Sequence, residues 1–110
     1  MNYDEEIKRS VDELIDRLKN TSEYKEYMHA TKVLNESPDI KEKVFEFRKE
    51  NYFLQHAPAG EDIYEKVEKL RAKNEELLYR PDASDFLMTE WAFFGIVQDI
   101  FDRIMENMEF

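Results

Sequence analysis

The chain of 110 residues has no cysteine and holds only two glycines and three prolines. Without cysteine it has no disulfide, no thiolate metal site and no cysteine nucleophile. Glycine and proline are the residues that most often form the tight turns between strands, and this chain has few of either. The composition alone therefore favours a helical chain.

Basic residues are also scarce, with 16 Lys and Arg against 26 Asp and Glu and a net charge of −10. Because neutralising phosphates takes clustered Lys and Arg, we expect no direct contact with nucleic acid or with anionic membrane lipids. A hydrophobic share of 42% is too high for a disordered acidic tail, and a charged share of 38% is too high for a membrane protein. The acidic stretch from Met1 to Asp16 is neither a signal nor a transit peptide. We expect one cytoplasmic domain over residues 1–110.

Apolar residues recur with the helical period in five segments, which predicts an all-α bundle of about five helices. Ser37-Pro38 and Arg80-Pro81-Asp82 are typical of helix starts, and Ala57-Pro58-Ala59-Gly60 is typical of a turn. Asn74 interrupts the apolar stripe of the fourth helix, either to set register against a paired helix or as a surface residue. The predicted helices run from Asp4 to about Asn20, Thr21 or Ser22 to Glu36, Pro38 to about His56, about Glu61 to Tyr79, and Asp82 to Met108.

The last of these helices is long and apolar. Between Phe86 and Met105 it holds thirteen apolar residues in twenty, and charged residues interrupt the run, so it is not a membrane span. At ~1.5 Å per residue the helix is roughly 40 Å long, longer than a compact chain of this size encloses. A second copy of the chain is the simplest structure that could cover the remaining apolar surface of this helix, which predicts an intertwined or packed homodimer. The expected contact residues to a copy or partner are Phe86, Glu90, Trp91, Phe94, Val97 and Phe101.

Two polar positions in this helix have alternative interpretations. Glu90 lies among aromatic residues, so it is either buried and paired with Arg80 or an inward lysine, or solvated on an exposed face. Gly95 either permits close approach of another helix or marks a bend. Residues 81–110 carry seven acidic side chains and one basic side chain, and so supply most of the net negative charge of −10. This acidity indicates either a solubilising edge or a face for a basic partner.

Patterns that would indicate catalysis are weak. Glu26 and His29 match Glu-x-x-His, but a carboxylate di-iron bundle needs a second copy of that motif, and Phe53 stands three residues before His56. Glycine-rich phosphate loops, nucleophile elbows and paired-histidine zinc motifs do not occur. We expect no catalytic residue, no metal and no cofactor. The alternative is a small helical enzyme or ligand-binding bundle, such as a helical chorismate mutase or a carboxylate metal site.

The order of these elements resembles the YlbF/YmcA family of small helical bacterial regulators, which includes the YheA-like branch. The resemblance covers nearly the whole chain and depends on helix caps, tyrosines and one glutamate of the last helix. The residues that carry it are Ser22-Glu23-Tyr24, Tyr27, Ser37-Pro38-Asp39-Ile40, Phe45-Glu46-Phe47-Arg48, Arg80-Pro81-Asp82 and Glu90.

The resemblance implies a cytosolic, non-enzymatic regulator that forms dimers or higher oligomers. Better-known branches of the family act with the partner YaaT to modulate RNase Y and mRNA processing, with effects on competence, biofilm formation and sporulation. Some members use cysteines to hold an iron–sulfur cluster in that complex. Because this sequence has no cysteine, it does not supply ligands of that kind.

Overall fold

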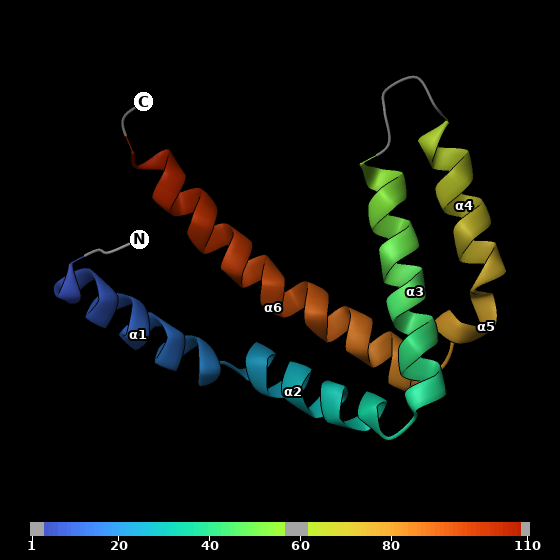
Figure 1. Cartoon of the computed structure of the whole chain (residues 1–110), viewed down its shortest axis with the longest axis horizontal. Helices are drawn as coiled ribbons and strands as arrows, with labels where there is room; N and C mark the ends of the chain where they lie inside the picture. The colour runs from blue at the N-terminus through green and yellow to red at the C-terminus, as the bar shows by residue number, and fades with distance from the viewer. Residues whose placement is uncertain (1–3, 57–61, 109–110) are drawn as a thin grey trace. The chain divides into compact units, whose positions relative to one another are not determined.

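The chain is described by a computed structural model that places residues 4–56 and 62–108 (Figure 1). These residues form helices and no strand, which confirms the predicted all-α fold. The predicted turn at residues 57–60 lies outside the described residues. The helices are α1 (Glu5–Lys19), α2 (Ser22–Asn35), α3 (Pro38–Gln55), α4 (Ile63–Lys73), α5 (Glu75–Leu78) and α6 (Pro81–Glu106).

The helix starts follow from local capping chemistry. Asp4 caps α1 by accepting a hydrogen bond from the backbone N–H of Glu6 at 2.7 Å. Thr21 caps α2, because its Oγ1 accepts from the backbone N–H of Tyr24 at 3.1 Å. Ser37 stands at the N-cap position of α3, but its side chain makes no capping hydrogen bond. Pro38 therefore begins α3 through its fixed φ angle rather than through a side-chain cap.

The fourth predicted helix is broken, so the prediction of one helix from Glu61 to Tyr79 was wrong. α4 ends at Lys73, and the short α5 begins at Glu75. Between them, Asn74 Nδ2 donates a hydrogen bond to the carbonyl oxygen of Leu70 at 2.9 Å. An Asn side chain that binds the last turn in this way competes with the backbone ladder and ends the helix. Asn74 is thus a helix-end residue.

The structure divides into two compact units: unit 1 is Met1–His29 with Met88–Phe110, and unit 2 is Ala30–Leu87. Helices α2 and α6 each contribute residues to both units. The single domain over residues 1–110 remains a prediction. Since each unit has its own set of contacts, we describe them separately.

Unit 2 contains most of the buried apolar side chains. Helices α3 and α4 lie side by side in it, with α5 following α4 (Figure 1). Phe86 is only 3% exposed, and its ring lies 6.1 Å from that of Phe45. The buried residues of this unit are Ala30, Leu34, Val44, Leu70, Leu77, Ala83 and Phe86.

An ion pair marks the start of α6 within unit 2. Arg80 Nε and Nη2 each donate to the Asp82 carboxylate at 3.1 Å, and the backbone N–H of Ala83 donates to it at 2.8 Å. The hydrogen bond from Arg80, helped by that of Ala83, lowers the pKa of Asp82 below its ordinary value of 3.8. A carboxylate in the first turn also interacts favourably with the helix dipole. The predicted Arg80-Pro81-Asp82 start is confirmed, and its arginine binds Asp82.

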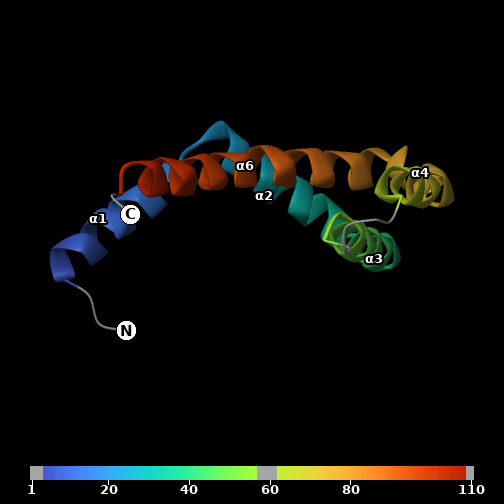
Figure 2. The ribbon, with the colours of Figure 1, turned by 90° about the horizontal axis from the view of Figure 1, so that it is seen from above.

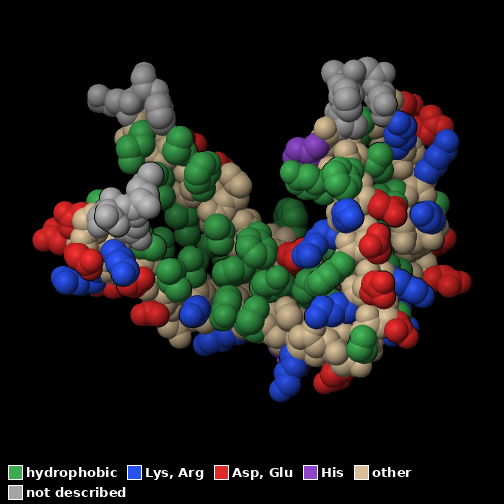
Figure 3. Space-filling view, in the orientation of Figure 1, with side chains coloured by type: hydrophobic (Ala, Val, Ile, Leu, Met, Phe, Trp, Pro, Cys, Tyr) green, Lys and Arg blue, Asp and Glu red, His purple; other side chains and the backbone are tan. Residues whose placement is uncertain are grey.

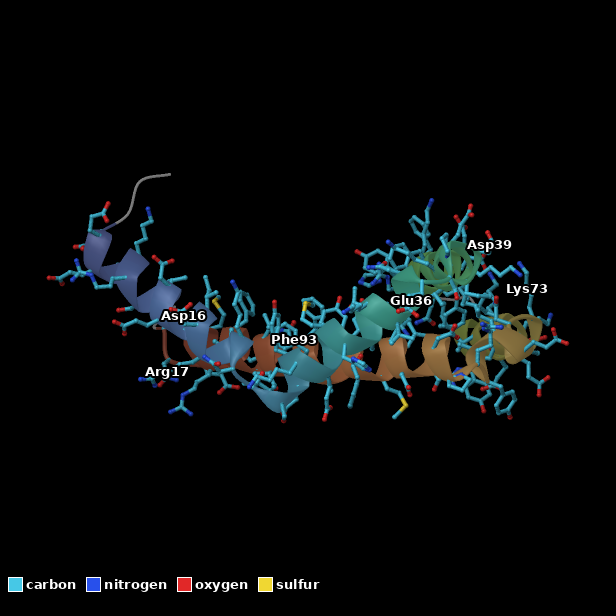
Figure 4. All side chains as sticks on the ribbon, turned by 90° about the horizontal axis from the view of Figure 1, so that it is seen from below. Asp16, Arg17, Glu36, Asp39, Lys73 and Phe93 are labelled. Atoms are coloured by element: carbon cyan, nitrogen blue, oxygen red, sulfur yellow. The ribbon has the colours of Figure 1, made fainter. Side chains whose placement is uncertain are left out.

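Unit 1 is built from α1, the first half of α2 and the greater part of α6. Only Phe93 is buried among its described residues. Its ring meets Tyr24 edge-on at 5.3 Å and stacks on Tyr27 at 6.0 Å. The side chain of Phe93 lies between α2 and α6 (Figure 4). Aromatic ring contacts therefore join the first half of α2 to the middle of α6.

Candidate functional site

The apolar surface of unit 1 is the most prominent feature of the chain. Of the eighteen large hydrophobic side chains that are exposed in the described residues, thirteen belong to this unit. Monomeric proteins rarely expose large contiguous apolar patches, and such patches mark sites of interaction. Figure 3 shows hydrophobic side chains gathered over α1 and α6, with charged side chains at the outer edges.

Helix α1 has no buried residue although its sequence is strongly amphipathic. Its apolar stripe consists of Ile7, Val11, Leu14, Ile15 and Leu18, and all of these side chains except the half-buried Leu18 are exposed. An amphipathic helix gains most of its stability by burying its apolar face. The described residues do not provide that burial, so the stripe faces solvent in this structure.

The residues predicted to contact a copy or a partner fall into two groups. Trp91 is 82% exposed, and Phe94, Val97 and Phe101 are exposed on the same helix. Phe86 belongs to the buried residues of unit 2 instead, with 3% of its surface exposed. The contact role of these residues remains a prediction. The exposed members that support it all lie on the part of α6 that belongs to unit 1.

Glu90 is half-buried beside the aromatic cluster of unit 1. Tyr27 Oη donates a hydrogen bond to Glu90 Oε2 at 3.5 Å, and the Tyr27 ring meets Phe94 edge-on at 5.7 Å. The same ring stacks on Phe93. The sequence left open whether Glu90 is buried or solvated. In the structure it is half-buried, and Tyr27 donates a hydrogen bond to it.

The middle of α6 is open on the side of Gly95. The helix continues without a break through this residue (Figure 2). A Cβ atom placed on Gly95 meets nothing within 4 Å among the described residues. The close helix approach that the glycine permits is thus not made by the described part of this chain.

The exposed face of α6 in unit 1 is apolar, and most of its acidic side chains lie on the other side of the helix. We define the α6 strip as the exposed apolar positions Phe94, Val97, Phe101, Ile104 and Met105. At 100° per residue, Asp102 lies nearest to one edge of this strip, whereas Asp99 and Glu106 lie on the opposite face of the helix. Gln98 Nε2 donates to Asp102 Oδ1 at 2.9 Å and holds that carboxylate on the helix surface.

A second exposed surface lies on α3, and sequence reasoning missed it. We define the α3 patch as Phe45, Arg48, Lys49, Tyr52 and His56, all of which are exposed. Their spacing places them on one face of the helix. The Arg48 guanidinium stacks over the Phe45 ring at 4.6 Å, and the rings of Tyr52 and His56 stack at 4.1 Å. The signal was the recurrence of basic and aromatic residues at helical spacing beside the buried stripe.

Unit 2 also has a hollow of about 770 Å³ beside α5. Lys43, Lys73 and Arg80 line it together with Glu75 and Glu76, so charges of both signs surround it. Lys73 also lies 3.9 Å from Glu50, and Arg80 binds Asp82; Figure 4 shows Lys73 and Asp39 in this part of unit 2. Because Lys73 and Arg80 have carboxylate partners, and Glu75 and Glu76 lie in the lining with Lys43, this hollow has no strong excess of one charge that would select a ligand.

The Glu26 and His29 pair lies on the surface of α2, with both side chains exposed. In residues 4–56 and 62–108, no group of three or more His, Cys, Asp or Glu side chains is placed to hold a metal ion. Over the same residues, none of the helices has the length and apolar character needed to cross a membrane. The apolar surface of unit 1 is therefore the feature that we develop as the functional site.

Comparison with known proteins identifies a family. The family model described as control of competence regulator ComK, YlbF/YmcA, matches residues 7–109 and so covers nearly the whole chain. No curated protein and no solved structure matches the chain.

Proposed function

This chain belongs to the YlbF/YmcA family, a family of regulators of the competence regulator ComK, and we propose that it is a non-enzymatic adaptor that regulates through protein contacts. The family match over residues 7–109 supports the regulatory part of this proposal. The adaptor part is supported by the uncovered apolar surface of unit 1, since regulators without catalytic groups act by binding. That surface is the observation that carries the proposal.

Self-association is the first contact that we propose. The unit 1 surface combines the apolar stripe of α1 with the α6 strip, and it includes the large side chains Trp91 and Phe101. Aromatic side chains that leave water at the centre of an interface contribute much of the binding energy. A closed homodimer, in which two copies cover each other's surface, is the simplest assembly that hides these side chains.

A second protein is the next contact that we propose. By analogy with the better-known branches of the family, it is of the YaaT or RNase Y type, and its regulation reaches competence, biofilm formation and sporulation in the cytoplasm. The 110 residues contain no cysteine, so this chain acts in such a complex without holding an iron–sulfur cluster through thiolates of its own. Its contribution is then the shape and charge of its helical surface.

Phe94→Asp tests the self-association. Phe94 is exposed on the α6 strip. If this strip is the subunit contact, assembly buries the carboxylate of the substituted aspartate, and the cost of that burial opposes assembly. We expect the dissociation constant of the dimer to rise by about 100-fold or more, as measured by size-exclusion chromatography with light scattering. Tyr64→Asp is the matched control, because Tyr64 is an exposed aromatic residue of α4 in unit 2. A wild-type chain that stays monomeric at high concentration contradicts the proposed dimer.

Affinity purification from the native host tests the adaptor role. The wild-type chain and Phe94→Asp serve as paired baits, so partners that need the unit 1 surface separate from those that do not. Recovery of a nuclease or its regulators supports the family role. Recovery of the chain alone, together with a bound small molecule, favours a ligand-binding bundle instead.

A further inference from the structure

The α6 strip has the residue spacing of a helix that pairs with another helix. Phe94, Val97, Phe101 and Ile104 follow one another at intervals of three, four and three residues, and all four side chains are exposed. This alternation is that of the two apolar positions of a heptad, which form a continuous seam along a paired helix. The strip therefore has the form of one half of a helix pair.

Uncharged residues border the α6 strip on both sides. At about 100° per residue, Gln98 follows along one edge and Ile100 along the other. Asp99 and Glu106 lie on the opposite face of α6. Asp102 lies beyond Gln98, whose amide donates a hydrogen bond to it. A second helix of the same kind thus meets no like charge along the strip, although this end of the chain is strongly acidic. The strip also lacks the flanking charges by which a paired helix selects a charged partner.

The α6 strip belongs to a surface large enough for a stable dimer. Trp91 lies at one edge of the strip, and Trp91, Phe94 and Phe101 are 82%, 49% and 56% exposed. These three side chains alone offer roughly 350 Å², at about 200 Å² for a whole aromatic side chain. Each partner contributes about 800 Å² to a standard interface. The aliphatic side chains of the strip and of the α1 stripe gather beside the aromatic ones (Figure 3) and add to their area.

We infer that the α6 strip packs antiparallel against the α6 strip of a second copy of this chain, about a two-fold axis at the level of residue 99. The inference rests on the proposed self-association and specifies the surface and the direction of the contact. In this arrangement Phe94 of each copy faces Ile104 of the other. Val97 of each copy likewise faces Phe101 of the other. Every phenylalanine of the strip then meets a smaller aliphatic side chain, which is the alternation that lets facing layers interdigitate.

Glu90 disfavours the parallel alternative. It lies four residues before Phe94 and in line with the strip, so a parallel pair in register brings the two Glu90 carboxylates together. Glu90 is already half-buried beside Tyr27, and two like charges held close and away from water repel strongly. In the antiparallel pair, each Glu90 lies nine residues from the axis. The two are then separated by about 27 Å along the helices, at ~1.5 Å per residue.

Spin labels on the outer face of α6 test the direction of pairing. The chain has no cysteine, so Asp99→Cys and Glu106→Cys each accept one nitroxide label per copy. Both sites are exposed, lie off the strip and lose the same charge, so they form a matched pair. In the antiparallel dimer, residue 99 is level with itself in the second copy, whereas the two residues 106 are about 21 Å apart along the helices.

Pulsed electron–electron double resonance measures the distance between the two labels of a dimer. We expect this distance to be longer by about 5–10 Å at residue 106 than at residue 99, because the offset along the helices adds to the separation across the pair. A parallel pair in register gives equal distances at the two sites.

A mixture of two variants tests which side chains face each other. In the proposed pair, a chain with Val97→Glu places its new carboxylate against position 101 of the second copy. We expect this variant to bind a chain with Phe101→Lys about 10-fold more tightly than it binds the wild-type chain, because a buried charge then meets an opposite charge. Sedimentation velocity and native mass spectrometry measure both affinities. If the two positions do not face each other, the second charge weakens the heterodimer instead.

The outcomes separate this inference from the proposed function. Equal label distances in a dimeric chain overturn the antiparallel pairing, while self-association stands. Labels too far apart to be measured at both sites show that another face of a copy, such as the α1 stripe, or another partner covers the strip, and they overturn it too. Weaker binding of Val97→Glu to Phe101→Lys than to the wild type also counts against it. A wild-type chain that is monomeric at all concentrations overturns both the inference and the proposed dimer.

Discussion

The two units of this chain solve the problem of burying apolar residues in different ways. In unit 2, residues such as Leu34, Val44 and Phe86 are buried within the chain, and the large apolar side chains that stay exposed are all aromatic. In unit 1, only Phe93 is buried among the described residues, and most exposed large side chains are aliphatic, as in the stripe of Ile7 and Val11 on α1. Three of the five exposed aromatic side chains of unit 2 are tyrosines, whose hydroxyl groups can face water, whereas aliphatic side chains have no polar end.

The difference indicates a division of labour. Unit 2 has its own buried core, so its stability comes from contacts inside the chain. Unit 1 has a regular amphipathic pattern but little burial among its described residues; under the proposed self-association, a second surface that covers it adds the missing stability. A unit that is stabilised by binding is well suited to a regulator, because its state then depends on its partner.

The strongest test of this difference between the units compares alanine substitutions at two phenylalanines of α6. Phe86 is buried in unit 2, whereas Phe101 is 56% exposed in unit 1. We expect Phe86→Ala to lower the free energy of unfolding by about 3–5 kcal/mol at every protein concentration, because it leaves a cavity. Phe101→Ala is expected to change it by less than about 0.5 kcal/mol in dilute solution and to weaken association when concentrated.

Urea unfolding at a low and a high protein concentration measures both effects. Equal losses for the two variants in dilute solution would show that the α6 strip is already buried in the monomer. The distinction between the units, as drawn from side-chain exposure, would then be lost.

The ion pair in unit 2 gives a smaller, pH-dependent effect. The pKa of Asp82 is lowered in the folded chain, so the stability it contributes is present above its ordinary value of 3.8 and is lost as the pH falls through the folded pKa. We expect Asp82→Asn to lower the free energy of unfolding by about 1 kcal/mol near neutral pH and by less at about pH 2. Asp99→Asn, on exposed α6, is the control. If the difference in the free energy of unfolding between Asp82→Asn and the wild type is as large at low pH as at neutral pH, the loss of stability does not come from the carboxylate charge.

The smallest effect expected is at Gly95 in unit 1. Since a Cβ atom at this position meets nothing within 4 Å, Gly95→Ala should raise the stability of the dilute chain by about 0.5–1 kcal/mol through helix propensity. Thermal unfolding followed by circular dichroism measures the gain. If Gly95→Ala forms a weaker dimer than the wild type at high concentration, the added methyl group disturbs the contact, which would place Gly95 against the second copy. A loss of stability in dilute solution would instead place another segment of this chain over Gly95.

The helices themselves could be predicted where local chemistry decides them. Asp4, Thr21 and Pro38 start helices through their own side chains or ring, which depends on a few neighbouring residues. The break at Asn74 was missed because the hydrophobic period continues across it, while one side-chain hydrogen bond to Leu70 ends the helix. The hydrophobic period indicates which face of a helix is apolar, but it contains no information about a single side-chain donor, such as the Asn74 amide, that competes with the backbone hydrogen bonds.

The candidate site was predictable in part for a related reason. The apolar excess of the last helix pointed to Trp91, Phe94, Val97 and Phe101, all of which are exposed. Phe86 has the same residue type on the same helix, yet its ring is buried near Phe45 of α3. Whether an apolar residue serves the core or the surface depends on which element lies opposite, and that partner is distant in the sequence.

The scarcity of glycine and proline, the absence of cysteine and the helical spacing of apolar residues determined by themselves that this protein is all-α and has no thiolate chemistry. Composition and period act locally, so they fix the class of structure without knowledge of contacts. Only the tertiary structure decided that unit 2 holds the core and that α1 and the unit 1 part of α6 keep their apolar faces exposed. The physical reason is that burial is a property of pairs of surfaces, and each helix carries only one surface of each pair.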